Sequence, residues 1–469
     1  YHMNYHLADG SGHIPVARTR PETYFGDSAV MVHPDDARYK ELVGKKVKLP
    51  LLDREITVIA DEHVDMEFGT GIVKVTPAHD QNDYEVGKRH DLEFITVFDE
   101  KGILNDFAGE FKGLERLEAR DIIVKRLEEE GFIEKIEEHV HQVGHCYRCH
   151  NVVEPYISKQ WFVRSEVAKR SIEKTNSGEA QFFPPHWINS YNAWMGDLRD
   201  WCISRQRDWG VPIALFRVKA TGEVILDEKV LNFIAMIFEM KGSDAWYTME
   251  IAELLYPGSG YQPEELEKVN DILDVWFDSG STWNAVLKSR NYDAGQYPTD
   301  LYVEGSDQHR GWFQSSLFLS AAVQSKAPYQ GILTHGFTVD AKGEKMSKSK
   351  GNVVAPDKVL KQYGSEILRF WVAMSDYQTD LKISDDILKQ IAEQYRKLRN
   401  TFRFLLANID DLETIIPYAE MGVLDRWIVS KAQTVFDEAH KQFSDYNFVG
   451  GMSTLNNFIV NELSGIFMD

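Results

Sequence analysis

Residues 343–352 read GEKMSKSKGN and concentrate lysine, serine and glycine in one short stretch. Such a loop can surround a triphosphate with ammonium groups, hydroxyls and backbone N–H donors. Lysine acts there as a point charge against phosphate charge that develops in a transition state. A basic, solvated surface loop has the same composition, and composition alone favours neither interpretation. The surrounding sequence has to decide between them.

Two further polar clusters lie near the start of the chain. One reads TRPET from Thr19 to Thr23, and the other reads KVTPAHD from Lys74 to Asp80, with Asp83 close behind. Each borders a strand-like run, where the chain can direct polar side chains into a pocket. Ordinary turn chemistry from Thr, Pro and Asp explains both clusters as well, and the residue types alone favour that simpler interpretation.

The first part of the chain is predicted to be a compact, mainly β module. Residues 46–49, 55–59 and 71–75 alternate at a period of two and are bounded by Gly, Pro and Asp, which predicts strands. Residues 114–130 are rich in Glu and Arg and stop at Gly131, which predicts a helix.

The later part alternates strand-like and helix-like segments. Residues 274–280 (DVWFDSG) are predicted to be a strand ending in a small-residue turn. Residues 301–313 (LYVEGSDQHRGWF) predict a strand, a glycine turn and a helix that continues through residues 317–323, and residues 332–337 predict a third strand. Polar residues at the ends of strands that alternate with helices indicate a parallel nucleotide-binding sheet.

The last 86 residues are predicted to be helical. Ser384 is a suitable N-cap, and apolar residues follow from Ile387 to Leu405 at spacings of three and four. Further helices are expected over residues 424–442 and from residue 447. Arginines on the other side of the first helix suit either a solvated face or contact with a nucleic-acid backbone. Arg205, in the segment WCISRQ, likewise either faces a nucleic acid or nucleotide or pairs with a buried acid.

Length and composition limit the class of protein in which these motifs can occur. The 469 residues suffice for about three domains, and 43% hydrophobic with 12% aromatic residues fit large cores. No run of about 20 apolar residues occurs, so no membrane span is expected. Three cysteines fit a reducing cytoplasm better than a disulfide framework. The net charge of −21 argues against a generally basic nucleic-acid coat but leaves room for a local basic stripe.

One C-x₂-C pair, Cys146 and Cys149, is flanked by histidines and forms half of a zinc knuckle. A second such pair is missing, because Cys202 stands alone in another motif. A zinc site completed by His141, His145 or His150 and a turn without metal both remain open, and the turn is favoured.

Taken together, these motifs resemble the class I aminoacyl-tRNA synthetases of the isoleucyl/valyl group over nearly the whole chain. The KMSKS string resembles the signature loop that stabilises the transition state of amino-acid activation by ATP. The TRPET and KVTPAHD clusters, with residues 66–71 (MEFGTG), resemble the editing domain of valyl-tRNA synthetase, whereas EGSDQHRGWF resembles the isoleucyl enzyme. Residues 1 to about 200 are therefore valyl-like and the rest isoleucyl-like, which suggests a recombinant or misassembled chain.

The resemblance implies an editing site that hydrolyses mischarged tRNA. The implied editing residues are Thr19, Arg20, Thr23, Lys74, Thr76, Asp80 and Asp83. Asp80 is expected to hold the attacking water or the substrate ammonium, and Lys74 the ester or the terminal ribose. A second site that hydrolyses wrong products is called double-sieve editing, and the isoleucyl and valyl enzymes are its standard example. Arg18 stands where the family usually carries a second threonine, so the pocket wall is expected to differ in shape.

The resemblance also implies an aminoacyl-adenylate site. Glu304, Lys345 and Lys348 are expected to be catalytic, with Glu304 on the substrate ammonium or adenylate and the lysines on phosphates. The implied substrate- and ATP-binding residues are Gly305, Asp307, Gln308, His309, His335, Trp276, Trp312 and Ser347. Trp276 and Trp312 would flank an aliphatic side chain, although plain core packing fits both equally well.

The implied fold class is α/β. A Rossmann-like parallel-sheet catalytic domain (residues 155–380) would carry an inserted β-rich editing domain (residues 1–154), and residues 381–469 would begin a helical anticodon-binding domain. The implied reaction is that of an isoleucyl-tRNA synthetase-type ligase, the ATP-dependent attachment of a branched aliphatic amino acid to tRNA with hydrolytic editing, in the cytoplasm. A valyl-tRNA synthetase fragment, a free-standing editing hydrolase and a tRNA-binding remnant are the alternatives.

The expected cofactor is Mg²⁺-bound ATP, and the expected partners are an isoleucine or valine acceptor tRNA and the free amino acid. The His-Ile-Gly-His ATP motif of this class does not occur in the chain. We therefore expect a fragment that does not form adenylate unaided, and a separate chain that carries the missing half is one hypothesis.

Overall fold

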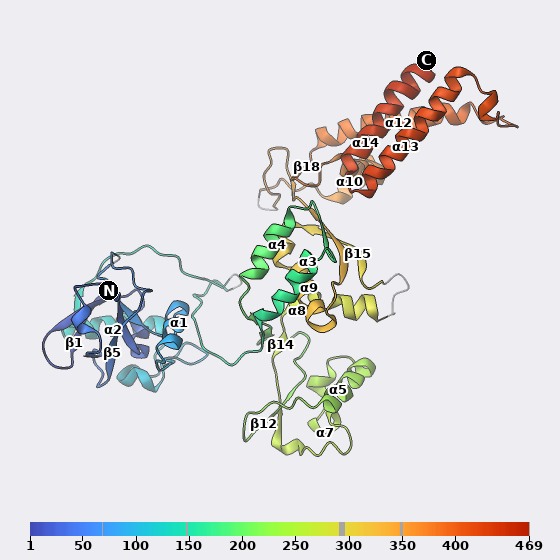
Figure 1. Ribbon diagram of the computed structural model, residues 1–469. Coiled ribbons are helices and arrows are strands. Elements are labelled where there is room, and N and C mark those ends of the chain that lie inside the picture. The colour runs from blue at the N-terminus through green and yellow to red at the C-terminus, as the bar shows by residue number, and fades with distance from the viewer. Residues whose placement is uncertain (68, 147–148, 290–295, 348–349, 469) are drawn as a thin grey trace. The chain divides into compact units, whose positions relative to one another are not determined.

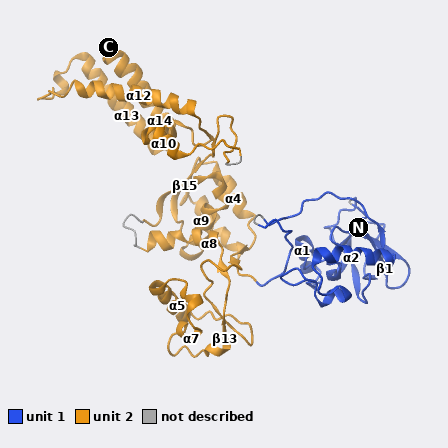
Figure 2. Ribbon diagram, turned by 180° about the vertical axis from the view of Figure 1, so that it is seen from behind, with its two compact units in different colours: residues 1–159 blue, residues 160–469 orange. Residues whose placement is uncertain are grey.

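A computed structural model describes residues 1–67, 69–146, 149–289, 296–347 and 350–468 of the chain. The chain divides into two compact units, unit 1 (Tyr1–Lys159) and unit 2 (Gln160–Asp469), coloured separately in Figure 2. The assignment of three functional domains to residues 1–154, 155–380 and 381–469 stays a prediction. In the described part of the chain, no helix is long and apolar enough to cross a membrane.

Unit 1 is built on a seven-stranded sheet in the order β2-β1-β4-β5-β3-β6, with β7 paired to β1. Its strands are β1 (His2–Leu7), β2 (His13–Ala17), β3 (Ala29–Val32), β4 (Lys46–Lys48), β5 (Glu55–Ala60), β6 (Ile72–Val75) and β7 (Ile133–Lys135). Buried and exposed residues alternate along β1, because successive side chains point to opposite faces of a sheet. The strands predicted over residues 46–49, 55–59 and 71–75 are confirmed as β4, β5 and β6.

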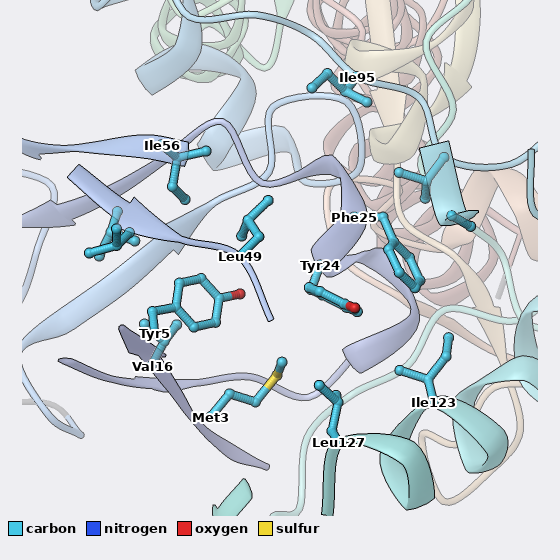
Figure 3. Packing of buried hydrophobic residues seen from close by; sticks show 14 of the residues in the cluster. Met3, Tyr5, Val16, Tyr24, Phe25, Leu49, Ile56, Ile95, Ile123 and Leu127 are labelled. Atoms are coloured by element: carbon cyan, nitrogen blue, oxygen red, sulfur yellow. The ribbon is translucent and has the colours of Figure 1, made fainter. Parts of the chain in front are cut away.

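The core of unit 1 packs the sheet against the 3₁₀ turn η1 (Pro21–Gly26) and helix α2 (Arg116–Glu129). Figure 3 shows Tyr24 of η1 close to Met3 of β1 in this core, with Ile123 of α2 nearby. All three side chains are fully buried. The core therefore fixes η1, the turn that carries most of the TRPET motif.

The helices of unit 1 are set by polar caps. Glu115 starts α2 by accepting hydrogen bonds from the N–H groups of Leu117 (2.8 Å) and Glu118 (3.2 Å). Helix α2 confirms the helix predicted over residues 114–130. Helix α1 (Gln81–Arg89), which the sequence did not single out, follows β6 and is capped by Asp80. It is short and has only two apolar residues, so it carries little periodic signal.

Unit 2 contains a three-stranded parallel sheet in the order β15-β16-β9. Strands β15 (Thr299–Gly305) and β16 (Tyr329–His335) confirm two predicted strands and their parallel pairing. Helix α9 (Trp312–Gln324) crosses from β15 to β16 and confirms the helix predicted through residues 317–323. Strand β9 (Gln181–Phe183) was not predicted. Figure 1 labels β15 and α9 of this region.

Two separate cores stabilise this part of unit 2. One joins the parallel sheet to α3, α4 and α9, and the other lies within residues 214–266 around the fully buried Trp246. The remaining strands are β8 (Phe162–Val163), β10 (Trp201–Cys202), β11 (Ser204–Arg205), β12 (Phe216–Val218), β13 (Leu266–Lys268), β14 (Ile272–Leu273), β17 (Thr338–Val339) and β18 (Leu381–Lys382). The remaining α-helices before residue 384 are α3 (Ala168–Asn176), α4 (Trp187–Gly196), α5 (Glu228–Lys241), α6 (Ala245–Thr248), α7 (Ile251–Leu254), α8 (Val275–Gly280), α10 (Pro356–Tyr363) and α11 (Ser365–Met374).

The strand predicted over residues 274–280 is wrong, because these residues form helix α8. The carboxylate of Asp274 accepts a hydrogen bond from the N–H of Trp276 (2.8 Å) and so starts the helix. The same carboxylate forms an ion pair with Arg205 at 2.5 Å, which decides between the two roles left open for that arginine. The apolar run is shared between the short strand β14 and α8.

The C-terminal helices agree with the sequence pattern. They are α12 (Asp385–Ala407), α13 (Val423–Ser444) and α14 (Phe448–Asn457), which lie side by side in Figure 1. Ser384 caps α12 by accepting a hydrogen bond from the N–H of Ile387 at 3.3 Å. Asn447 caps α14 in the same way.

Candidate functional sites

The predicted editing residues of unit 1 come from η1 and from the connection between β6 and α1. The ammonium of Lys74, near the end of β6, bonds to the carboxylate of Asp83 and lies 3.8 Å from that of Asp80. Asp83 is buried and also accepts a hydrogen bond from the N–H of Thr76 (2.8 Å). The structure therefore brings Lys74, Thr76, Asp80 and Asp83 together.

The pKa values of Asp80 and Asp83 are shifted in opposite directions. Burial raises the pKa of Asp80, but the charge of Lys74 and two backbone N–H groups outweigh it, so the pKa lies below its ordinary value. Burial also raises the pKa of Asp83, and there Lys74 does not fully offset it. Asp80 is the more exposed of the two, with 41% of its side-chain surface open. It is the ionised carboxylate that a substrate or water can reach.

The TRPET motif contributes one side chain to this site. The guanidinium of Arg20 donates to the backbone oxygen of His79 at 2.9 Å, beside Asp80. Thr23 is buried and its hydroxyl donates to the backbone oxygen of Arg20 at 3.0 Å, so it stabilises the turn. Thr19 is exposed and has no hydrogen-bond partner among the described residues.

Beneath this site lies a fully buried polar cluster that the motif comparison did not predict. Asp27 accepts hydrogen bonds from Arg18 (2.8 Å), Thr76 (2.7 Å) and Tyr5 (2.6 Å). The Arg18 side chain is only 1% exposed, because its guanidinium pairs with Asp27 inside the core. Whether the pocket wall differs in shape from that of the family stays a prediction.

The predicted adenylate residues of unit 2 cluster where the parallel strands end. Glu304 and Gly305 of β15 stand opposite Thr334 and His335 of β16. Carboxyl ends of neighbouring parallel strands share one edge of the sheet, which is where such sheets bind nucleotides. His335 is half-buried, and its Nδ1 lies 2.8 Å from the backbone oxygen of Gly336.

The turn after β15 is held by the amide of Gln308. Its oxygen accepts from the N–H of Trp312 (2.9 Å), and its NH₂ donates to Asp307 (3.0 Å). A Cβ on Gly311 would lie 2.5 Å from the Gln308 oxygen and 3.1 Å from the ring of Trp276. A side chain at position 311 would therefore force the Gln308 amide and the Trp276 ring to shift.

A cavity of about 800 Å³ opens between β15, α8 and the start of α9. It is lined by Trp276, Ser279, Thr282, Val286, Leu287, Thr299, Leu301, Tyr302, Val303, Glu304, Gln308 and Trp312. Trp312 stacks on Tyr302 with a centroid separation of 4.0 Å and donates to the backbone oxygen of Ser279 at 2.9 Å. Both tryptophans therefore line the cavity, and Trp312 also joins the neighbouring core. A mostly apolar wall with one carboxylate suits an apolar molecule that carries a positive charge.

His309 was predicted to be a substrate- or ATP-binding residue, but its ring is fully buried. It lies 2.9 Å from the Thr334 hydroxyl and stacks on Trp187 with a centroid separation of 4.6 Å. Burial lowers the pKa of His309 to about 4, so the ring is neutral at pH 7. This placement does not support the predicted direct contact. The buried ring instead packs against the end of β16, at Thr334.

The KMSKS loop follows the short strand β17, and Lys348 and Ser349 lie outside the described residues. Asn352 organises the described part: it accepts from the N–H of Ser347 (2.9 Å) and donates to Asp340 (2.9 Å). The side chain of Lys345 is exposed and forms no ion pair with any described residue. Lys345 and Ser347 do not line the cavity described above. The sequence analysis assigned no role to Asn352, although it is the last residue of the stretch 343–352.

Next to the C-x₂-C pair, the N–H of Cys146 donates to the backbone oxygen of Asn151 (2.9 Å). Nδ1 of His145 lies 2.7 Å from the backbone oxygen of His150. Among the residues that the structure describes, no group of three or more His, Cys, Asp or Glu side chains is arranged to hold a metal ion. A structural zinc site needs four ligands, so the described residues do not fit one.

Comparison with known proteins places these sites in a family. The family model described as "tRNA synthetases class I (I, L, M and V)" matches residues 44–384. The isoleucine--tRNA ligase of Sulfurimonas denitrificans is 58% identical over 436 residues, which are 90% of this chain and 47% of the relative. That of Nitratiruptor is 56% identical over 95% of this chain and 49% of its own length.

The isoleucine--tRNA ligase of Sulfurovum is 51% identical and covers 99% of this chain, so one protein matches both the valyl-like and the isoleucyl-like parts. A recombinant or misassembled chain is therefore not needed to explain the sequence. A LeuRS-tRNA-LeuAMS complex from Agrobacterium radiobacter covers 99% of this chain and 56% of its own at 17% identity, with a TM-score of 0.48. The chain spans about half the length of the curated relatives it matches. It belongs to the class I tRNA synthetases of the isoleucine, leucine, methionine and valine group.

Proposed function

We propose that this chain is part of an isoleucine--tRNA ligase, in which unit 2 takes part in ATP-dependent activation of isoleucine and unit 1 hydrolyses mischarged tRNA. The observation that carries the proposal is the identity of more than 50% to isoleucine--tRNA ligases across both units. The cavity geometry and the ionised cluster of unit 1 support it.

In activation, the amino-acid carboxylate attacks the α-phosphate of Mg²⁺-bound ATP, and pyrophosphate leaves. Glu304 is assigned to the substrate ammonium, because it is the carboxylate on the cavity wall. Trp276 and Trp312 are assigned to the aliphatic side chain. Such a reaction needs positioning and charge stabilisation more than a side-chain nucleophile.

Gly305, Asp307 and Gln308 are assigned to the ribose and adenylate, since Gly305 ends β15 and the other two follow it, at the edge where parallel sheets bind nucleotides. Lys345 and Lys348 are assigned to the phosphates. Support for Lys345 comes from its exposure and from the absence of an ion pair with any described residue, which leaves its ammonium open to an anion. Ser347 and Asn352 would hold the loop in shape.

In editing, a water molecule attacks the ester between the amino acid and the terminal ribose, and the ribose hydroxyl leaves. Asp80 is assigned to the water or the substrate ammonium because it is ionised and accessible. Lys74 is assigned to the ester oxygen or ribose. Its pairing with Asp83 fixes the ammonium beside the reacting atoms.

Two assays test the proposal. The full-length protein that contains this chain should catalyse ATP–pyrophosphate exchange with isoleucine in preference to valine, and Glu304→Gln should abolish most of it. The chain itself, at saturating tRNA, should deacylate valyl- or threonyl-tRNA that carries the isoleucine anticodon while sparing isoleucyl-tRNA. Exchange that prefers valine would favour the valyl alternative, and no deacylation of either substrate would refute the editing assignment.

A further inference from the structure

Glu154 places its carboxylate between two arginines of unit 1. One oxygen bonds to the guanidinium of Arg20, and the other lies 3.1 Å from Nε of Arg116. The side chain of Glu154 is 11% exposed and that of Arg116 is 13% exposed. Two guanidinium groups that face one oxyanion are a typical phosphate-binding arrangement, because each can donate in a planar fork.

The fit of Glu154 to this position is incomplete. Nε of Arg116 is buried and makes no properly directed hydrogen bond to any described residue, although Glu154 is close. A carboxylate offers two oxygens in one plane, whereas a phosphate offers acceptors in several directions. A phosphate would therefore satisfy a donor that Glu154 leaves unused.

The segment that carries Glu154 is lightly attached. It has no helix or strand, and its neighbours Val153 and Tyr156 are 57% and 42% exposed. Near Glu154 the segment is held by hydrogen bonds from Arg116 to the backbone oxygen of Val152 (3.1 Å) and from the N–H of Val153 to the backbone oxygen of Gly144 (2.9 Å), and His79 contacts the backbone of Pro155. A cavity of about 350 Å³, lined in part by Arg116, Glu154 and Tyr156, adjoins it. Moving the segment therefore breaks these contacts and the two ion pairs of Glu154.

Glu154 balances the net charge of the surrounding side chains. Three arginines (Arg20, Arg116 and Arg120) pair with three glutamates (Glu22, Glu115 and Glu154) in a connected network. Glu22 is fully buried and held by Arg120 at 2.7 Å and 2.8 Å, so it is fixed. Removing Glu154 from the network leaves one positive charge in excess, next to the candidate editing site.

We propose that Arg20 and Arg116 form a binding site for a phosphate of the RNA strand whose end enters unit 1, and that Glu154 fills this site until the RNA displaces it. The proposal rests on the proposed editing function and extends it, because Arg116 and Glu154 were not assigned to any site. Glu154 is then a competitor for the substrate and sets how tightly unit 1 binds RNA.

Binding of a short single-stranded RNA oligonucleotide to the whole chain, measured by fluorescence anisotropy, tests the site. Glu154→Gln should bind the RNA about tenfold more tightly, as expected for freeing two charge-assisted hydrogen-bond donors. The slope of log affinity against log salt should steepen by about 0.7, the value for one further contact to a single strand. The double variant Glu154→Gln/Arg116→Gln should return to the parent affinity.

Glu138→Gln is the matched control, because Glu138 is on the same connecting segment, is exposed and forms no ion pair with any described residue. It should leave RNA affinity unchanged. Weaker or unchanged RNA binding by Glu154→Gln would overturn the proposal. Arg116→Gln alone, which keeps Glu154, gives a second test if the first variant does not fold: it should weaken RNA binding. Inorganic phosphate competing as well as RNA would assign the site to small anions and likewise overturn it.

The binding assay is independent of catalysis, so the two proposals fail separately. If the parent chain deacylates no tRNA but Glu154→Gln gains RNA affinity, the editing function fails and the phosphate site stands. If deacylation occurs, Glu154→Gln should lower KM and leave kcat unchanged. A fall in kcat with unchanged KM would instead mean that Glu154 positions Arg20 for the reaction, and the competitor role would be refuted.

Discussion

Replacement of Arg18 by threonine, the residue usual in the resembling family, is expected to destabilise unit 1 strongly. Arg18 and Asp27 are 1% and 0% exposed, and their closest atoms are 2.8 Å apart. Burial by itself would lower the pKa of Arg18, but the adjacent Asp27 raises it above its ordinary value, so the guanidinium stays charged. Arg18→Thr leaves the Asp27 carboxylate buried without its counter-charge.

Breaking a buried ion pair by removing one partner costs about 3–5 kcal/mol. Tyr5 and Thr76 still donate to Asp27, which places the expected loss toward the lower end of that range. The double variant Arg18→Thr/Asp27→Asn should recover part of the loss, because no unpaired charge stays buried. Lys46→Thr is a control: its pair with Glu55 spans 3.7 Å and is exposed, and such pairs contribute about 0–1 kcal/mol.

Unit 1 contains no tryptophan, since all 11 lie beyond residue 159. Tryptophan fluorescence during urea unfolding therefore reports on unit 2, and amide hydrogen exchange in β1 and β3 reports on unit 1. Arg18→Thr should lower protection in unit 1 and leave the fluorescence midpoint unchanged. The reasoning is refuted if protection in unit 1 changes by less than about 0.5 kcal/mol, the range of an ordinary surface substitution.

Three further predictions concern single residues. The stability of unit 2 should fall as the pH drops from 6.5 toward 4. Burial lowers the pKa of His309 from 6.5 to about 4, so the unfolded state binds more protons in this range. In urea unfolding experiments, His309→Gln should remove this pH dependence, and the exposed control His440→Gln should not. Asp80→Asn should slow deacylation by roughly 10²-fold, as for loss of one positioned charge, while circular dichroism shows α1 retained because the amide oxygen still caps the helix; undiminished activity would contradict the role of the carboxylate. Elemental analysis should find less than one zinc per chain, and one tightly held zinc would instead implicate Cys146 and Cys149.

Several elements could be predicted because their signal is local. Strands β4, β5 and β6 alternate at a period of two, and α12 repeats apolar residues at spacings of three and four after the cap Ser384. The strand ends that carry Glu304 and His335 were predicted for the same reason, since β15 and β16 are short apolar runs followed by polar residues. Their pairing side by side followed from the alternation of strands and helices.

The helix α8 shows where local pattern failed. DVWFDSG is apolar and aromatic enough for a strand, but the hydrogen bond from the Trp276 N–H to the Asp274 side chain caps a helix there. Arg205 had two open roles for a similar reason: its partner Asp274 lies 69 residues away in the sequence, and no pattern links them.

The sequence by itself determined the family, the main elements and the motif residues near each site. The tertiary structure alone decided which motif side chains face a cavity and which face the core: Arg18 and His309 lie within matched motifs, yet both are buried. It also decided the pairing of Arg20 with Glu154, which are 134 residues apart. A linear pattern records residue type and spacing, whereas burial and ion pairing depend on which distant segment the folded chain packs against each side chain.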